Sequence, residues 1–161
     1  MEGNRTEELD YLGIFKEFNR KRIYYSFSGP KRKEIMELLK DELSKEEKIT
    51  FAFLYGSFLD ESPFRDVDLG IFVKGPELLS PLYEFQLESR FRKSTGNLFP
   101  IEVRIINKAP VTFLYHVIKG ELIFCRDDDF CSDFMEIVAK KYSDLKHFLD
   151  HYSKEAYGKE D

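Results

Sequence analysis

The sequence runs Leu54-Tyr-Gly-Ser-Phe-Leu-Asp-Glu-Ser-Pro-Phe-Arg-Asp-Val-Asp-Leu-Gly-Ile-Phe-Val73 through the stretch that decides its fold. This stretch begins in an apolar, β-rich run at residues 49–55, which breaks at Gly56-Ser57. A polar loop follows, and residues 66–73 form a second short run that Gly75-Pro76 stops. Apolar runs of this length between turn residues are typical of strands, so the pattern predicts two strands joined by a loop.

Helical and strand-like patterns alternate on both sides of this stretch. In the helical segments apolar residues recur every three or four positions, and capping residues or Pro and Gly stand at the ends. We expect helices from Gly29 to between Ser44 and Glu47, from Ser80 to Gly96, from Pro110 to Gly120 and from Phe130 to Tyr152, strands at residues 22–27, 98–106 and 121–125, and helical spacing at residues 9–18. The alternation predicts an α/β (α+β) domain with a mixed β-sheet flanked by helices, including a long C-terminal helix of about 25 residues.

Composition is that of a single-domain globular protein. Of the 161 residues 42% are hydrophobic, which provides enough apolar surface for a buried core. The net charge of −5 disfavours a protein that coats nucleic acid by charge alone, and Cys125 and Cys131 are too few for a disulfide framework. No run approaches the roughly 18 apolar residues of a membrane span, and the N-terminus lacks the pattern of a secretory signal. We therefore expect a cytoplasmic protein with no membrane segment, divided into an N-terminal extension (1–28) and a domain (29–161).

The two aspartates of Asp66-Val-Asp68 carry the first chemical signal. Residues two apart on a strand point to the same side, so these two carboxylates are forced close together. Like charges at such range repel, and hard oxygen ligands of this kind suit Mg²⁺. Taken alone, the pair is explained more simply as a solvated strand end. Gly56-Ser57 shifts the balance, because a glycine at a strand exit permits close backbone approach and leaves N–H groups to face a phosphate.

The combined pattern of strand, Gly-Ser, loop and Asp-x-Asp resembles the signature of the DNA polymerase beta-like nucleotidyltransferases, especially their minimal members. In this chain Tyr55 precedes Gly56-Ser57, and a gap of eight residues, shorter than the family's usual gap, leads to Asp66. The family has a third acid on a later strand. Glu102 takes that position here, where minimal members more often have Asp. The likeness spans approximately residues 50–128.

The resemblance implies a nucleotidyltransferase fold and a Mg²⁺-dependent transfer of a nucleoside monophosphate, most simply AMP from ATP. By this likeness Asp66 and Asp68 bridge two Mg²⁺ ions, while Glu102 completes one ion site and can take the acceptor's proton. Gly56-Ser57 would hold the β- and γ-phosphates of the nucleoside triphosphate. Arg65 is near enough in sequence to add positive charge.

The sequence does not identify the molecule that accepts the nucleotide. The small size and the lack of accessory domains resemble the minimal enzymes that act as antitoxins by adding AMP to a separate toxin of the HEPN type. Transfer to a small molecule or to RNA is the enzymatic alternative. A catalytically inactive nucleotide-binding or regulatory module is the alternative from another class. Base preference, oligomeric state and the effect of the short loop are open as well.

Polar residues of the last expected helix have simpler explanations than binding sites. His147 and His151 lie four residues apart, which can suit a metal, but they fit the polar face of the helix better. Asp127-Asp-Asp129 fits an N-cap and first-turn charges. The apolar stripe of this helix is wide enough to bind a partner or a second copy of the chain.

Basic residues cluster at three places, residues 20–22, 31–33 and 90–93. Solvated faces explain them most simply. If two clusters shared the rim of one cleft, an RNA acceptor would be favoured. Arg104, like Arg65, is a further cation close in sequence to the candidate acids.

Overall fold

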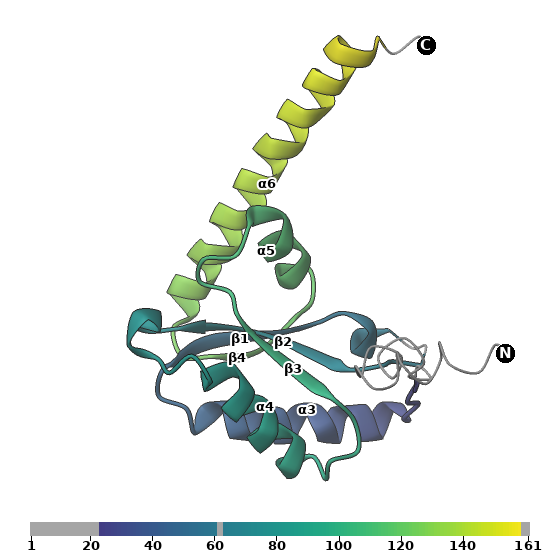
Figure 1. The fold of residues 1–161 in the computed structure, drawn as a ribbon, viewed down its shortest axis with the longest axis vertical. Coiled ribbons are helices and arrows are strands. Elements are labelled where there is room, and N and C mark those ends of the chain that lie inside the picture. Colours follow the sequence, from purple (N-terminus) through teal and green to yellow (C-terminus); the bar gives the residue numbers. More distant parts are fainter. Residues whose placement is uncertain (1–22, 61–62, 159–161) are drawn as a thin grey trace, which may run out of the picture.

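The computed structural model describes residues 23–60 and 63–158. Within these residues four strands form one mixed sheet (Figure 1). They are β1 (Ile49–Tyr55), β2 (Val67–Val73), β3 (Ile101–Ile105) and β4 (Glu121–Cys125), in the order β3-β2-β1-β4 across the sheet. β1 pairs antiparallel with β2 and β4, whereas β2 and β3 run parallel. A parallel pair needs a crossover connection, so the long segment between β2 and β3 is required, and the predicted mixed sheet is confirmed.

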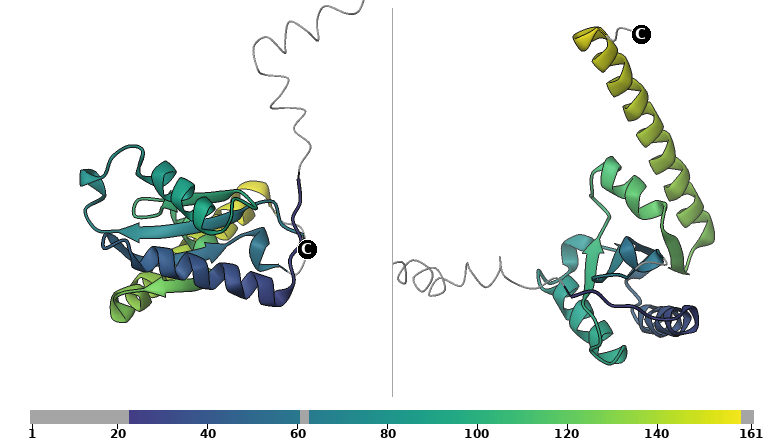
Figure 2. Two further views of the ribbon diagram at one scale, coloured as in Figure 1. Left: turned by 90° about the horizontal axis from the view of Figure 1, so that it is seen from below. Right: turned by 90° about the vertical axis from the view of Figure 1, so that its right-hand side faces the viewer.

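Helices cover both faces of the sheet. α3 (Gly29–Ser44) and α4 (Tyr83–Ser94) lie on one face, and α5 (Val111–Ile118) and α6 (Asp128–Tyr157) lie on the other (Figure 1). α6 has 30 residues, and its C-terminal half projects beyond the sheet (Figure 2). The helix is therefore longer than the sequence predicts. In the described part of the chain, no helix has the length and apolar content to cross a membrane.

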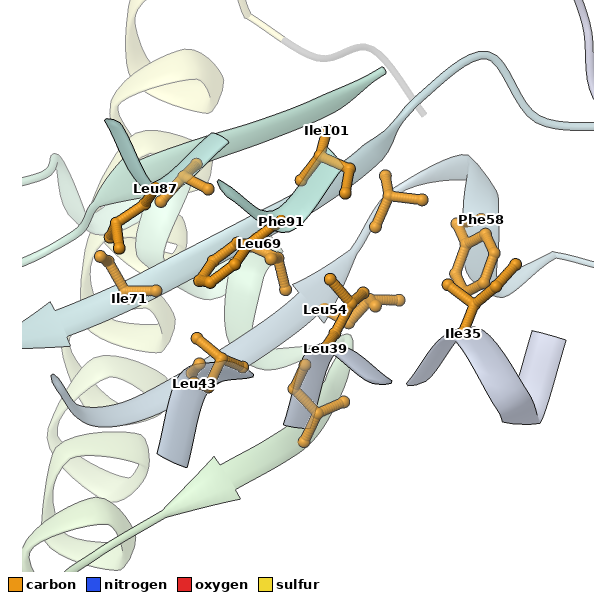
Figure 3. Close-up of a cluster of buried hydrophobic side chains, with 14 of the residues drawn as sticks. Ile35, Leu39, Leu43, Leu54, Phe58, Leu69, Ile71, Leu87, Phe91 and Ile101 are labelled. Carbon is orange, nitrogen blue, oxygen red and sulfur yellow. The ribbon is translucent and has the colours of Figure 1, made fainter. Parts of the chain in front are cut away.

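Apolar side chains of α3 and α4 pack against alternate residues of the sheet (Figure 3). The buried members include Ile35, Leu39 and Leu43 of α3, Leu54 of β1, Leu69 and Ile71 of β2, and Leu87 and Phe91 of α4. Their spacing of four in the helices and two in the strands is the period of each element. Burial of each such side chain contributes roughly 1.5–3 kcal/mol, so this layer fixes the helices on the sheet.

The opposite face of β1 presents aromatic side chains to α5 and α6. Phe51 and Phe53 are fully buried there, together with Tyr55. The ring of Phe51 stacks on Phe72 of β2 and contacts Phe134 of α6, with centroids 5.0 Å apart in both pairs. β1 is thus buried over its whole length, which explains its unbroken apolar run in the sequence.

Side chains cap the first turns of α3 and α6, and the cap of α6 is the one that the sequence predicts. The Ser28 hydroxyl accepts a hydrogen bond from the Lys31 backbone N–H at 3.3 Å, and Pro30 lies in the first turn of α3. At the start of α6 the Asp127 carboxylate accepts one from the Phe130 N–H at 3.0 Å. The acidic residues there serve as cap and first-turn charges, as expected.

The strand expected at residues 22–27 is wrong in the part that the structure describes. Among residues 23–27 only Tyr25 pairs, in an isolated bridge to Phe64. Phe64 belongs to a loop, so it offers no strand along which the pairing can extend. The helical spacing at residues 9–18 and the basic cluster at residues 20–22 lie outside the described residues.

The start of α4 also differs from the expectation. Ser80 does not cap the helix, since its hydroxyl and carbonyl oxygens accept hydrogen bonds from the Leu82 and Tyr83 N–H groups and close a separate turn. The helix begins at Tyr83 and ends before Gly96, whose positive φ of 81° allows the reversal that the sequence predicts.

β3 is an edge strand, and two carboxylates of α4 take the place of a further strand. Glu88 accepts a hydrogen bond from the Val103 N–H, and Glu84 accepts one from the Ile105 N–H, both at 2.9 Å. Four residues of a helix and two residues of a strand each span about 6 Å, so the two acceptors match the two donors. The bracing fixes β3 beside β2 and sets the position of Glu102.

Glu88→Ala is expected to destabilise the domain by about 1–3 kcal/mol, because the Val103 N–H would lose its acceptor. Thermal unfolding followed by circular dichroism measures the change. Glu88→Gln keeps a carbonyl oxygen and should lose less. Gln86→Ala, on the exposed side of α4, is the matched control. Equal stability of the Glu88→Ala and Gln86→Ala variants would contradict the bracing role.

Candidate active site

Three carboxylates converge at one end of the parallel strand pair. Asp66 directly precedes β2, Asp68 lies in β2 and Glu102 lies in β3. Oxygen atoms of the three side chains lie within 4.8 Å of one another. Asp68 and Glu102 are paired across the parallel ladder, and both project away from Leu69 and Val103, which pack against α3 and α4. The structure thus brings the three sequence-predicted acids to one side of the sheet.

Gly56 lets the end of β1 approach these acids. Tyr55 pairs with Asp68 across the antiparallel ladder, so Gly56 lies directly beside that carboxylate. Its φ is +82°, and a Cβ at this position would stand 2.5 Å from Asp68 Oδ2. The positive φ favours glycine, and any other residue would push the Asp68 carboxylate aside. Ser57 then begins a short 3₁₀ helix, η1 (Ser57–Leu59), at the same edge of the site.

The loop before Asp66 is held by buried aromatic residues, which corrects the expectation of a polar loop. Phe58 and Phe64 are buried and pack edge to face with centroids 4.9 Å apart. The guanidinium of Arg32 on α3 lies over both rings. It also donates hydrogen bonds to the carbonyls of Phe58 and Asp60. Both ends of the short loop are therefore anchored on the core.

Asp68 has the raised proton affinity of a partly buried acid with two acidic neighbours. Burial and the negative charges of Asp66 and Glu102 raise the pKa of Asp68 to about 6, while Arg104 and Arg65 act in the opposite direction. A carboxylate that ionises reluctantly in this way is short of positive charge. The cluster is therefore suited to a divalent cation, which supplies that charge and accepts oxygen ligands.

The two arginines near the acids act differently. Arg104 Nε donates a hydrogen bond to Glu102 Oε1 at 2.8 Å, and its guanidinium lies over the Phe113 ring. It therefore orients Glu102. Arg65 is exposed in the bend before Asp66, from where its charge reaches Asp68.

A cavity of about 480 Å³ opens beside Gly56. Tyr55, Gly56 and Ser57 line one side of it, His116, Lys119 and Gly120 line another, and Leu59 and Asp60 complete the lining. His116 and Lys119 are not among the sequence-predicted site residues. The sequence feature that could have indicated them is the Lys119-Gly120 turn, because a glycine between a helix and a strand permits close approach of two backbones.

Other polar clusters are engaged elsewhere. His151 pairs with Glu155 on α6 at 3.1 Å. Arg90 forms ion pairs with Glu42 and Glu46, which holds α4 to the end of α3. A larger hollow of about 660 Å³ lies at the opposite end of the sheet beside the start of α6, away from the three acids.

Gly56→Ala is expected to abolish binding of Mn²⁺, a spectroscopic substitute for Mg²⁺, because the added Cβ would displace the Asp68 carboxylate. Titration followed by electron paramagnetic resonance measures free Mn²⁺. The control is Gly29→Ala, since a Cβ at Gly29 meets nothing within 4 Å. Unchanged Mn²⁺ affinity of the Gly56→Ala variant would show that the close approach is dispensable.

Asp68→Asn is expected to raise the melting temperature at pH 7.5 without divalent ions, by roughly 2–4 °C for each kcal/mol regained. The pKa of Asp68 is about 6 in the folded protein against an ordinary 3.8, so folding stability falls as the pH rises through this interval. The neutral amide escapes that loss. Scanning calorimetry should show the two proteins converging below the ordinary pKa. Identical melting temperatures at pH 7.5 would refute the assignment.

Comparison with known families agrees with this geometry. The model of the polymerase beta nucleotidyltransferase family matches residues 37–129, more than half of the chain. A search of curated proteins by sequence finds no significant match.

Several solved structures of similar fold come from toxin–antitoxin pairs. The structure of the tri-AMPylated Shewanella oneidensis HEPN toxin with MNT antitoxin contains a chain with 14% identity and a TM-score of 0.53, over 78% of this chain and 94% of that chain. A toxin–antitoxin structure with AMP-PNP gives 15% identity and a TM-score of 0.56, over 77% and 96%. The MntA-HepT pair gives 13% identity and a TM-score of 0.53, over 80% and 97%. These likenesses establish the fold, and with the family match they identify the chain as a nucleotidyltransferase that belongs to the polymerase beta family.

Proposed function

We propose that this nucleotidyltransferase uses Mg²⁺ to transfer AMP from ATP to a hydroxyl group of a separate HEPN-type protein. The observation that carries the proposal is the convergence of Asp66, Asp68 and Glu102 beside Gly56-Ser57. The reaction requires carboxylates that suit a divalent cation and a backbone bend that suits phosphates. In this protein the acids lie next to the Gly56-Ser57 bend.

The donor set fits Mg²⁺. All three side chains supply hard oxygen ligands within reach of one ion, and the raised pKa of Asp68 reflects a shortage of positive charge. Asp66 and Asp68 would hold two ions between them, with Glu102 completing one site. Bound there, Mg²⁺ would neutralise the charge that develops on the phosphate oxygens during transfer.

The chain's own residues would position the reactants. The Gly56 N–H and the Ser57 hydroxyl donate hydrogen bonds to the β- and γ-phosphates, and Arg65 adds positive charge at the rim. Glu102, oriented by Arg104, accepts the proton of the attacking hydroxyl. The acceptor oxygen attacks the α-phosphorus in line with the departing pyrophosphate.

The protein acceptor is supported by the similar solved structures. One of them holds a HEPN toxin that carries AMP with an MNT antitoxin, and another holds AMP-PNP. This chain also has a surface for such a partner, since the projecting half of α6 exposes Phe148, Leu149 and Tyr152. Apolar residues gathered on one helix are typical of protein contacts.

The activity test incubates the protein with α-labelled ATP, Mg²⁺ and a candidate HEPN-type protein, such as the product of a neighbouring gene. Wild type should label the partner, and Asp68→Ala should be slower by about 1000-fold, because several kcal/mol of charge stabilisation would be lost. Asp144→Ala, an exposed acid on α6, should remain active.

Two other results would redirect the proposal. Label on an RNA or a small molecule, with the HEPN-type protein unlabelled, would exclude the protein acceptor and retain the enzyme. ATP binding without transfer to any acceptor would indicate a nucleotide-binding regulatory module. Transfer that survives in the Asp68→Ala variant would remove the carboxylate cluster from the mechanism.

A further inference from the structure

We propose that Lys119 binds the β- and γ-phosphates of the nucleotide in the cavity beside Gly56-Ser57. The inference depends on the proposed use of ATP and adds a binding residue to it. Lys119 follows the last residue of α5 and lines the same cavity as Ser57. A lysine and a serine facing one cavity supply a positive charge and a hydroxyl donor, which together suit a polyphosphate.

Gly120 determines where Lys119 lies. A Cβ on Gly120 would stand 2.2 Å from the Leu54 carbonyl oxygen and 3.0 Å from Tyr55 Cβ, so the turn after α5 is pressed against the end of β1. Hydrogen bonds from the Lys119 and Gly120 N–H groups to carbonyls of α5 hold this turn. Lys119 is therefore placed beside the exit of β1, where Gly56 approaches Asp68.

The position of the acids favours phosphates over the base in this cavity. Asp68 and the cavity share Gly56 as a common wall, so an α-phosphate held at the acids leaves the β- and γ-phosphates next to Gly56. The Gly56-Ser57 bend, the Ser57 hydroxyl and the Lys119 ammonium together present hydrogen-bond donors and positive charge to one cavity, which suits phosphates. The two rings that line the cavity, His116 and Tyr55, already pack edge-on against each other with centroids 5.5 Å apart, so their contact is not the parallel stack that a base would make.

The cavity has two charged side chains of opposite sign, and the proposal predicts that they affect nucleotide binding in opposite directions. Lys119 contributes a positive charge and Asp60 a negative one, and both side chains are exposed enough to move toward a ligand. The Lys119 ammonium lies 5.1 Å from the centre of the Tyr115 ring, which is not part of the cavity lining, so it would leave this contact to reach a phosphate. A polyphosphate should be attracted by Lys119 and repelled by Asp60.

Isothermal titration calorimetry with Mg-ATP and with AMP tests the inference. Lys119→Ala should weaken ATP binding about 10-fold or more, the loss expected for a charge-assisted hydrogen bond, and leave AMP binding unchanged. Lys119→Arg should retain most of the ATP affinity, and Asp60→Asn should increase it. The control is Lys108→Ala, an exposed lysine after β3 at the other end of the sheet.

Three results would overturn the inference. Unchanged ATP affinity in a folded Lys119→Ala variant excludes the contact. Equal weakening of ATP and AMP places the nucleoside in the cavity instead of the phosphates. Failure of the wild-type protein to bind ATP removes the proposed function itself, and with it this inference, so the two failures are told apart by the wild-type titration.

Discussion

The close approach of the Gly56 backbone to the Asp68 carboxylate is the constraint on which the site depends. β1 and β2 are paired so that Tyr55 lies opposite Asp68. The chain leaves β1 through Gly56, whose φ of +82° is a conformation that glycine adopts readily. Any side chain at position 56 would occupy the space of the carboxylate oxygen. Because the two segments meet there, a phosphate bound by the bend and a cation bound by the acids would be neighbours.

The rest of the sheet serves to hold Glu102 opposite Asp68. The parallel pairing of β2 and β3 aligns these two residues, and the carboxylates of Glu84 and Glu88 satisfy the outer edge of β3. At the far end of the pair, the amide of Asn107 accepts a hydrogen bond from the Val73 N–H at 3.0 Å and donates one to its carbonyl at 2.7 Å. Side chains thus satisfy backbone groups along and beyond β3, the edge strand, and hold its Glu102 in place.

Placing three acids together costs stability in the absence of a counter-ion. Burial and like charge raise the pKa of Asp68, and the ion pair of Arg104 with Glu102 offsets only part of the negative charge. A neutral residue in place of Asp68 would remove this cost. Three acids gathered at such a cost are the physical mark of a candidate functional site, and a bound cation would supply the charge that they lack.

The sequence by itself determined the strands of the sheet, the start of α3 at Gly29-Pro30, the cap of α6, and the alternation that directs Asp68 and Glu102 to one face, because these depend on local period and spacing. Local pattern could not reveal that Arg32 anchors the short loop through Phe58 and Phe64, or that residues 23–27 have no strand to pair with. Only the tertiary structure decided that the turn after α5 packs on the end of β1 and brings Lys119 beside Gly56, since that contact joins segments about 60 residues apart whose meeting no periodicity encodes.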